Sequence, residues 1–120
     1  MKYLVLLYSN PTAWEALSPD DTAAAMAFFE ELRHETVTSG ELVDTAGLAD
    51  AAHARTVRLR DGAPIATDGP FAEGEEVLAS YAIYDVDSHD RALQLAGRVA
   101  EATAGAVEVW PVMDLSAAEM

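Results

Sequence analysis

Acidic side chains are densest between residues 68 and 76, where the chain reads DGPFAEGEE. The carboxylates of this stretch are Asp68, Glu73, Glu75 and Glu76. A carboxylate becomes a useful base near neutral pH when burial or a like-charged neighbour raises its pKa. We expect Asp68 and Glu73 to be the catalytic carboxylates, because Asp68 sits at a rigid turn whereas Glu75 follows flexible Gly74.

The same acids also have a structural interpretation. Asp68 can accept hydrogen bonds from backbone N–H groups and stabilise its own turn. The glutamates that follow can simply lie in solvent, as runs of charge usually do. Proton transfer and turn stabilisation both stay open on the residues alone.

Further side chains could bind or orient a substrate. Arg58 shares a strand face with Arg60 and could hold a small polar or anionic ligand, although pairing with the many acids is an alternative. Tyr8 and Tyr81 could donate hydrogen bonds into a pocket, although aromatics on central strands more often lie in a core or an interface. We expect Phe71 to point inward beside the bend, where it would contact a substrate.

Metal and thiol chemistry find no support in the sequence. The histidines, His34, His53 and His89, lack the spacing of a metal-binding motif, and the chain has no cysteine. No phosphate-binding glycine loop or Gly-x-Ser-x-Gly turn is present. We therefore expect no metal, cofactor or disulfide, which fits a cytoplasmic protein.

The net charge of −14 arises from 21 acids against seven basic residues. Such a field repels phosphate backbones and anionic lipid surfaces. No apolar run reaches the roughly 18 residues that suggest a membrane span. We expect neither a nucleic-acid nor a membrane partner.

The bend at Gly69-Pro70 positions the candidate acids, because Pro70 fixes its own φ and disfavours helix at the preceding residue. The β-branched and aromatic run Val77–Val86 then predicts the central strand. The nearly continuous apolar run Tyr3–Tyr8 predicts an inner strand buried on both faces, and Ala106–Val112 predicts the last strand.

Two helices are predicted between these strands. The first begins at the Ser18-Pro19 cap and ends at Gly40. Its inner face would carry Ala25, Phe28, Phe29, Leu32 and Val37. The second is capped by residues 87–90 and ends at Gly105. Its inner face would carry Ala92, Leu95, Ala96 and Val99.

The stretch between the first helix and the bend has weaker signals. We expect a short extended piece at Glu41–Asp44 within a loop. Thr56–Arg60 alternates, and Asp61-Gly62 is a pair that two-residue hairpin turns prefer, so a hairpin returning through Pro64–Thr67 is predicted.

This element order predicts an α+β domain with an antiparallel sheet and two helices on one face. The other face would carry Tyr8, Tyr81, Tyr84 and Trp110. A monomer would leave that apolar surface exposed to water, so we expect a homodimer. We expect one domain over residues 1–113 and a flexible tail over 114–120.

The bend resembles the signature of the DGPF branch of the YCII-related family: Asp68-Gly69-Pro70-Phe71-Ala72-Glu73, then Glu76, Leu78, Tyr81, Ile83, Asp85 and Val86. The likeness extends to Lys2–Tyr8, Glu30-Glu31-Leu32, Gly40-x-Leu42 and Ala54-x-Thr56-Val57-Arg58. It implies a ferredoxin-like dimeric α/β barrel. Some members are associated with a His–Asp pair, which makes His34 a catalytic candidate. Gly74-Glu75 replaces a common Thr-Lys pair, so the cationic role at that position is absent.

Two functions stay open. One is a cofactor-independent enzyme or small-ligand binder with its pocket beside the bend, between sheet and helices. Asp68 or Glu73 would be the base for proton abstraction, isomerisation or elimination, and Tyr81 or Arg58 would hold the substrate. The other is a non-catalytic homodimeric module that binds a protein partner, because the resemblance implies an association with sigma-factor regulation.

Overall fold

The computed structural model describes residues 1–71 and 74–114. Its helices and strands are β1 Lys2–Ser9, α1 Pro11–Glu15, α2 Pro19–Thr38, β2 Leu42–Gly47, the 3₁₀ turn η1 Ala51–His53, β3 Arg55–Arg60, β4 Ala63–Asp68, β5 Val77–Asp85, α3 His89–Thr103 and β6 Ala106–Pro111. Of the expected tail, residues 115–120 lie outside the described residues.

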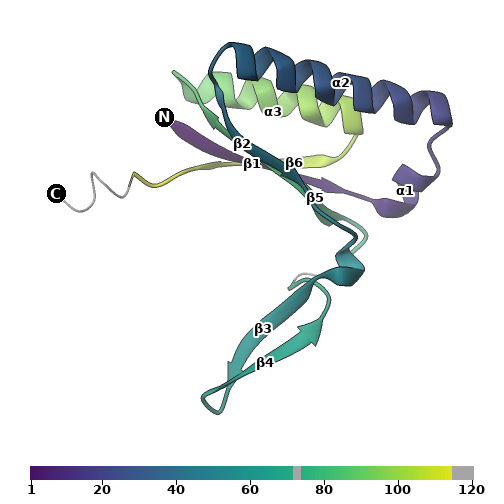
Figure 1. Cartoon of the computed structure of the whole chain (residues 1–120), viewed down its shortest axis with the longest axis vertical. Coiled ribbons are helices and arrows are strands. Elements are labelled where there is room, and N and C mark those ends of the chain that lie inside the picture. The colour runs from purple at the N-terminus through teal and green to yellow at the C-terminus, as the bar shows by residue number, and fades with distance from the viewer. Residues whose placement is uncertain (72–73, 115–120) are drawn as a thin grey trace.

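A four-stranded antiparallel sheet forms the base of the domain, in the order β2-β5-β1-β6. The long helices α2 and α3 lie side by side on one face of this sheet (Figure 1). The two strand–helix–strand units, β1-α2-β2 and β5-α3-β6, interleave their strands in a ferredoxin-like arrangement. The predicted α+β class, antiparallel sheet and helix layer are therefore confirmed.

Strand β1 has one buried face, not two. Tyr3, Val5 and Leu7 are buried beneath the helices, whereas Leu4 and Leu6 point the other way and are half-buried. Within one chain the expectation that both faces are buried is wrong, because the helices cover only one face of the antiparallel sheet. The uniform apolar composition of β1 hides this alternation.

Tyr84 lies in the core and not on the outer sheet face where we expected it. It is the β5 partner of Tyr3, and residues paired across antiparallel strands share a face. Tyr81 pairs with Leu6 and therefore lies on the opposite face. Tyr84 therefore does not contribute to the expected apolar surface on the outer sheet face.

The N-terminal signals of α2 act as predicted. The Ser18 hydroxyl oxygen accepts a hydrogen bond from the Asp21 backbone N–H at 3.1 Å. Val37, expected on the inner face, is instead 55% exposed, and Thr36 takes the buried position. The Thr36 hydroxyl donates to the Leu32 carbonyl at 2.8 Å, so its burial leaves no hydrogen bond unmade.

Helix α3 also follows its sequence pattern. The Ser88 hydroxyl caps its first turn, and the predicted inner face is buried: Ala92, Leu95, Ala96 and Val99. Ala104 ends the helix with a left-handed φ of 52°. A Cβ on Gly105 would lie 2.5 Å from the Tyr8 carbonyl oxygen, so glycine allows the helix end to approach β1.

The predicted hairpin forms, with Asp61 and Gly62 at φ of 53° and 80° between β3 and β4. Two consecutive positive φ values are those of a type I′ turn, whose twist matches that of paired strands. The hairpin is a separate two-stranded sheet that extends away from the main sheet (Figure 1). The extended piece predicted at Glu41–Asp44 becomes β2 and provides the fourth strand of the main sheet.

Glu41 and Arg91 tie the start of β2 to the first turn of α3. The guanidinium of Arg91 donates from Nε to Glu41 Oε2 at 2.8 Å and from Nη2 to Oε1 at 2.9 Å. This two-point hydrogen bond lowers the pKa of Glu41 to about 2 from its ordinary value of 4.5.

We predict that Glu41→Gln destabilises the chain at neutral pH and that the difference from wild type shrinks as the pH falls from 4.5 to about 2. In that window the unfolded chain binds a proton on Glu41 while the folded chain does not, so the contribution of the pair is lost. Urea unfolding at several pH values measures this. Glu31→Gln is the matched control, because Glu31 is exposed and forms no ion pair with the described residues. A pH-independent difference for Glu41→Gln would contradict the assignment.

Candidate ligand-binding site

A cavity of about 830 Å³ lies between the helix-facing side of the sheet and helices α1 and α2. It is lined by residues of β1, β2 and β5, by the loop after β2, and by the C-terminal end of α3. Volumes of roughly 300–1,000 Å³ are typical of small-molecule sites. The size of this cavity therefore suits an organic ligand.

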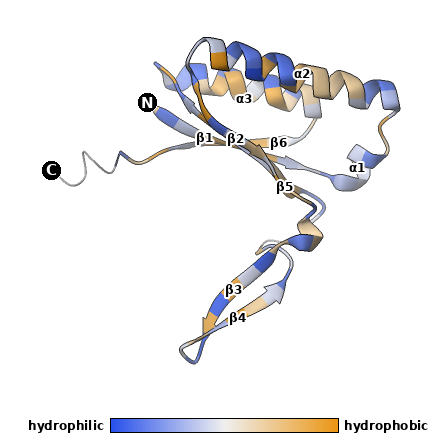
Figure 2. Cartoon of the chain, in the orientation of Figure 1, coloured by the Kyte–Doolittle hydropathy of each residue, from blue (hydrophilic) through white to orange (hydrophobic). Residues whose placement is uncertain are grey.

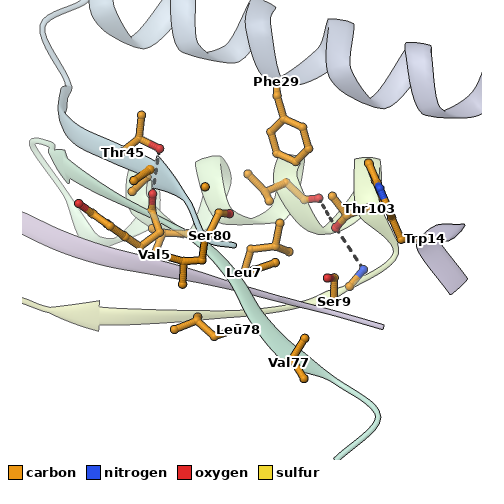
Figure 3. Close-up of a pocket in the computed structure, with 18 of the residues that line it drawn as sticks. Val5, Leu7, Ser9, Trp14, Phe29, Thr45, Val77, Leu78, Ser80 and Thr103 are labelled. Carbon is orange, nitrogen blue, oxygen red and sulfur yellow. Dashed lines mark hydrogen bonds between the residues drawn. The ribbon is translucent and has the colours of Figure 1, made fainter. Parts of the chain in front are cut away.

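The walls of the cavity are mainly apolar. Figure 3 shows Phe29 pointing from α2 toward the sheet, with Val5 and Leu7 on the strand below it and Trp14 of α1 at one end. The ring of Phe29 also packs edge-on against Phe28, which fixes its position. An apolar molecule entering here would exchange water for carbon contacts.

Four serine and threonine side chains line the same space (Figure 3): Ser9, Thr45, Ser80 and Thr103. Thr45 donates to the Tyr81 carbonyl at 2.8 Å, and Thr103 donates to the Val99 carbonyl at 2.9 Å. Within the described residues the hydroxyls of Ser9 and Ser80 make no hydrogen bond. These two groups are available to a polar atom of a ligand.

Charged residues around the cavity are mostly acidic. Glu15, Asp50 and Glu76 are among the lining residues, against one arginine, Arg33. The Arg33 guanidinium also lies 3.9 Å from a carboxylate oxygen of Glu30. The local field therefore favours a neutral or cationic ligand over an anionic one.

The two tyrosines predicted to bind substrate each contact a carboxylate. Tyr81 is among the residues that line the cavity, but its side chain lies on the outer sheet face, where its hydroxyl donates to Asp44 Oδ2 at 2.9 Å and this hydrogen bond raises its pKa. A hydrogen bond to Glu108 likewise raises the pKa of Tyr8. Neither hydroxyl is free to activate a substrate in this arrangement.

The structure places three candidates on or beside the projecting hairpin: Arg58, Asp68 and Phe71. Asp68 pairs with Arg55 at 3.2 Å and is exposed. The guanidinium of Arg58 lies 4.7 Å from the centroid of the Phe71 ring. None of the three lines the cavity.

Phe71 does not point inward. Its side chain is 75% exposed, so the expectation that the bend aims this ring into the core is wrong. Gly69 has a φ of 89°, and its N–H donates to the Ala54 carbonyl at 2.9 Å, which closes the hairpin at its base. The bend therefore belongs to the hairpin and not to the core.

The remaining candidates are dispersed. Glu73 lies outside the described residues, and Glu75 is exposed. His34 is exposed on α2 and is not among the lining residues. Across residues 1–71 and 74–114 no three His, Asp or Glu side chains gather to hold a metal ion.

Of the residues predicted to bind or transform a substrate, Tyr81 is among those that line the cavity, and sequence reasoning missed the others. Ser9, Ser80 and Phe29 belong to no chemical motif, and only the tertiary fold brings them together. Helix α1 did carry a signal: Asn10 accepts hydrogen bonds from two backbone N–H groups ahead of Pro11, the usual start of a helix.

The profile of the YCII-related domain matches residues 1–116. The chain belongs to the YCII-related family. It is also 32% identical over 114 residues to an uncharacterised protein of Rhizobium meliloti (strain 1021), an alignment that covers 93% of this chain and 92% of the relative. The family match therefore covers almost the whole of this YCII-related chain, and the alignment covers most of the relative.

No helix in the described part of this YCII-related chain is long and apolar enough to cross a bilayer.

We predict that Phe71→Ala changes the free energy of unfolding by less than about 1 kcal/mol, because an exposed ring loses only its contact with Arg58. Leu95→Ala is the comparison: Leu95 is fully buried, and its truncation should cost about 2–5 kcal/mol. Chemical denaturation of both variants measures this. A loss for Phe71→Ala as large as that for Leu95→Ala would place the ring in a packed environment.

Proposed function

We propose that this YCII-related chain binds a small, mainly apolar molecule, neutral or cationic, in the cavity between the sheet and α1 and α2. The observation that carries the proposal is the cavity itself, about 830 Å³ with apolar walls and few polar groups. Ser9 and Ser80 would receive the polar end of the ligand, and Phe29 would cover its apolar body.

Binding receives more support than catalysis. A general base must come within hydrogen-bond reach of the proton that it removes. Asp68 is paired with Arg55 on the hairpin and does not line the cavity. The enzyme hypothesis built on Asp68 and Glu73 therefore stays a proposal with less support than ligand binding. Arg58, the residue that favoured an anionic ligand, is likewise outside the lining.

We predict that the neutral fluorophore N-phenyl-1-naphthylamine binds the wild-type chain and that Ser80→Leu weakens this binding at least about tenfold. The added side chain points into the cavity and takes the volume that the ligand needs (Figure 3). Fluorescence titration measures the affinity, and circular dichroism checks that the variant is folded.

Two controls separate the cavity from other apolar surfaces. Leu59→Ala changes an exposed hairpin residue that does not line the cavity and should leave the affinity unchanged. Trp110→Ala tests whether the fluorophore binds instead to the outer sheet face. Wild-type affinity in Ser80→Leu, or loss of binding in Trp110→Ala alone, would rule out the cavity as the binding site.

We also propose that the chain forms a homodimer through the outer sheet face. Leu4, Leu6 and Tyr81 lie there by register, and β6 adds Trp110, which is 54% exposed. The helices cover the opposite face only (Figure 1). Pairing two such faces removes an apolar surface from water.

We predict a dimeric mass at micromolar concentration and a dimer weakened by up to a few kcal/mol in Trp110→Ala, because exposed aromatics are frequent interface anchors. Sedimentation equilibrium measures both. Leu93→Ala, an exposed residue of α3 on the helix layer, should behave as wild type. A monomeric wild-type chain would disprove the dimer.

A further inference from the structure

The β3–β4 hairpin stands away from its own domain. Figure 1 shows it extending on the side of the sheet opposite to the helices. The Cα radius of gyration is 16.7 Å, whereas a compact chain of this length should have about 14 Å. An isolated two-stranded hairpin is at best marginally stable in water, so this element needs a surface to pack on.

One face of the hairpin is apolar. Residues paired across the two strands share a face, and beyond the Arg55–Asp68 pair at the base this face carries four apolar residues: Val57, Leu59, Pro64 and Ala66. Val57 is 63% exposed and Leu59 is 76% exposed. Figure 2 shows hydrophobic segments on both strands, far from the core that the helices form. This apolar face has no partner within the described part of the chain.

The opposite face is basic. It carries Arg58 and Arg60 together with the apolar Ile65, and neither arginine forms an ion pair with a described carboxylate. Residues 55–68 contain three arginines and two aspartates, a net charge of +1. The rest of the chain has four basic residues and 19 acids, a net charge of −15. The hairpin is thus electrostatically complementary to the body of this same protein.

The base of the hairpin is held firmly. The Thr56 hydroxyl donates to the Gly69 carbonyl at 2.9 Å, the Gly69 N–H donates to the Ala54 carbonyl at 2.9 Å, and Arg55 pairs with Asp68 at 3.2 Å. These cross-links hold together the point where the hairpin leaves the domain. Asp68 and Gly69 of the bend therefore have a structural role, because they close the base of the hairpin.

We propose that the hairpin is an arm that packs on the body of a second copy of this chain. Its apolar face would pack on the outer sheet face of the partner, and the net positive charge of the arm would favour its approach to the acidic partner body. Two bodies of charge −15 repel each other, so a contact between the positive arm and the partner body is the favourable electrostatic contact between copies. The inference rests on the homodimer proposed above and identifies the segment that stabilises it.

The test uses the full chain with Leu59→Asp, which puts a negative charge on the apolar face at an exposed position that the fold tolerates. Sedimentation equilibrium should show a dimer dissociation constant raised at least about tenfold, and Arg60→Glu should raise it as well. Leu93→Asp is the matched control, because Leu93 is an exposed leucine on the helix layer, and it should leave the constant unchanged.

Cross-linking locates the contact directly. The chain has no cysteine, so Leu59→Cys carrying a photoreactive label gives one defined point of attachment. Mixed isotopically heavy and light chains should yield heavy–light products joined to peptides of β1, β5 or β6. A wild-type dimer that Leu59→Asp leaves intact, or cross-links confined to one chain, would overturn the arm and leave the homodimer standing. A monomeric wild type would overturn both.

Discussion

The antiparallel pairing of β1 with both β5 and β6 is the constraint on which the rest of this structure depends. Alternation along β1 directs Tyr3, Val5 and Leu7 toward the helices and leaves the residues between them on the other side. Both surfaces on which the functional proposals depend follow from it. The helix-facing side forms the floor of the cavity, and the opposite side remains as an apolar sheet face.

Much of the fold could be predicted, because its signals are local. The Ser18 and Ser88 caps, the Asp61-Gly62 turn and the inner face of α3 each depend on residues a few positions apart. The burial of Tyr84 and the position of Leu6 on the outer sheet face could not be predicted in this way. They depend on strand register, including an irregularity between Leu7 and Tyr8, and register is decided by pairing between distant segments.

The site was harder to predict than the fold for a related reason. Carboxylates that cluster in sequence, as they do around Asp68, suggest a catalytic site. The cluster does not indicate whether the segment that carries them lies beside the core or extends away from it. The cavity instead takes Ser80, Phe29 and Trp14 from three separate elements, none of which is chemically conspicuous alone. Apolar binding sites leave little trace in a single sequence, because their walls have the composition of an ordinary core.

The closure of the hairpin base also bears on how such a chain can change over evolutionary time. The segment leaves at Ala54 and returns at Gly69, and hydrogen bonds join these two points. A loop whose ends meet can lengthen, shorten or be replaced without shifting the register of the strands on either side. The ferredoxin-like body and its cavity could thus be retained while the sequence and length of the β3–β4 hairpin change. The body and the hairpin are therefore two parts of one small domain that can vary independently.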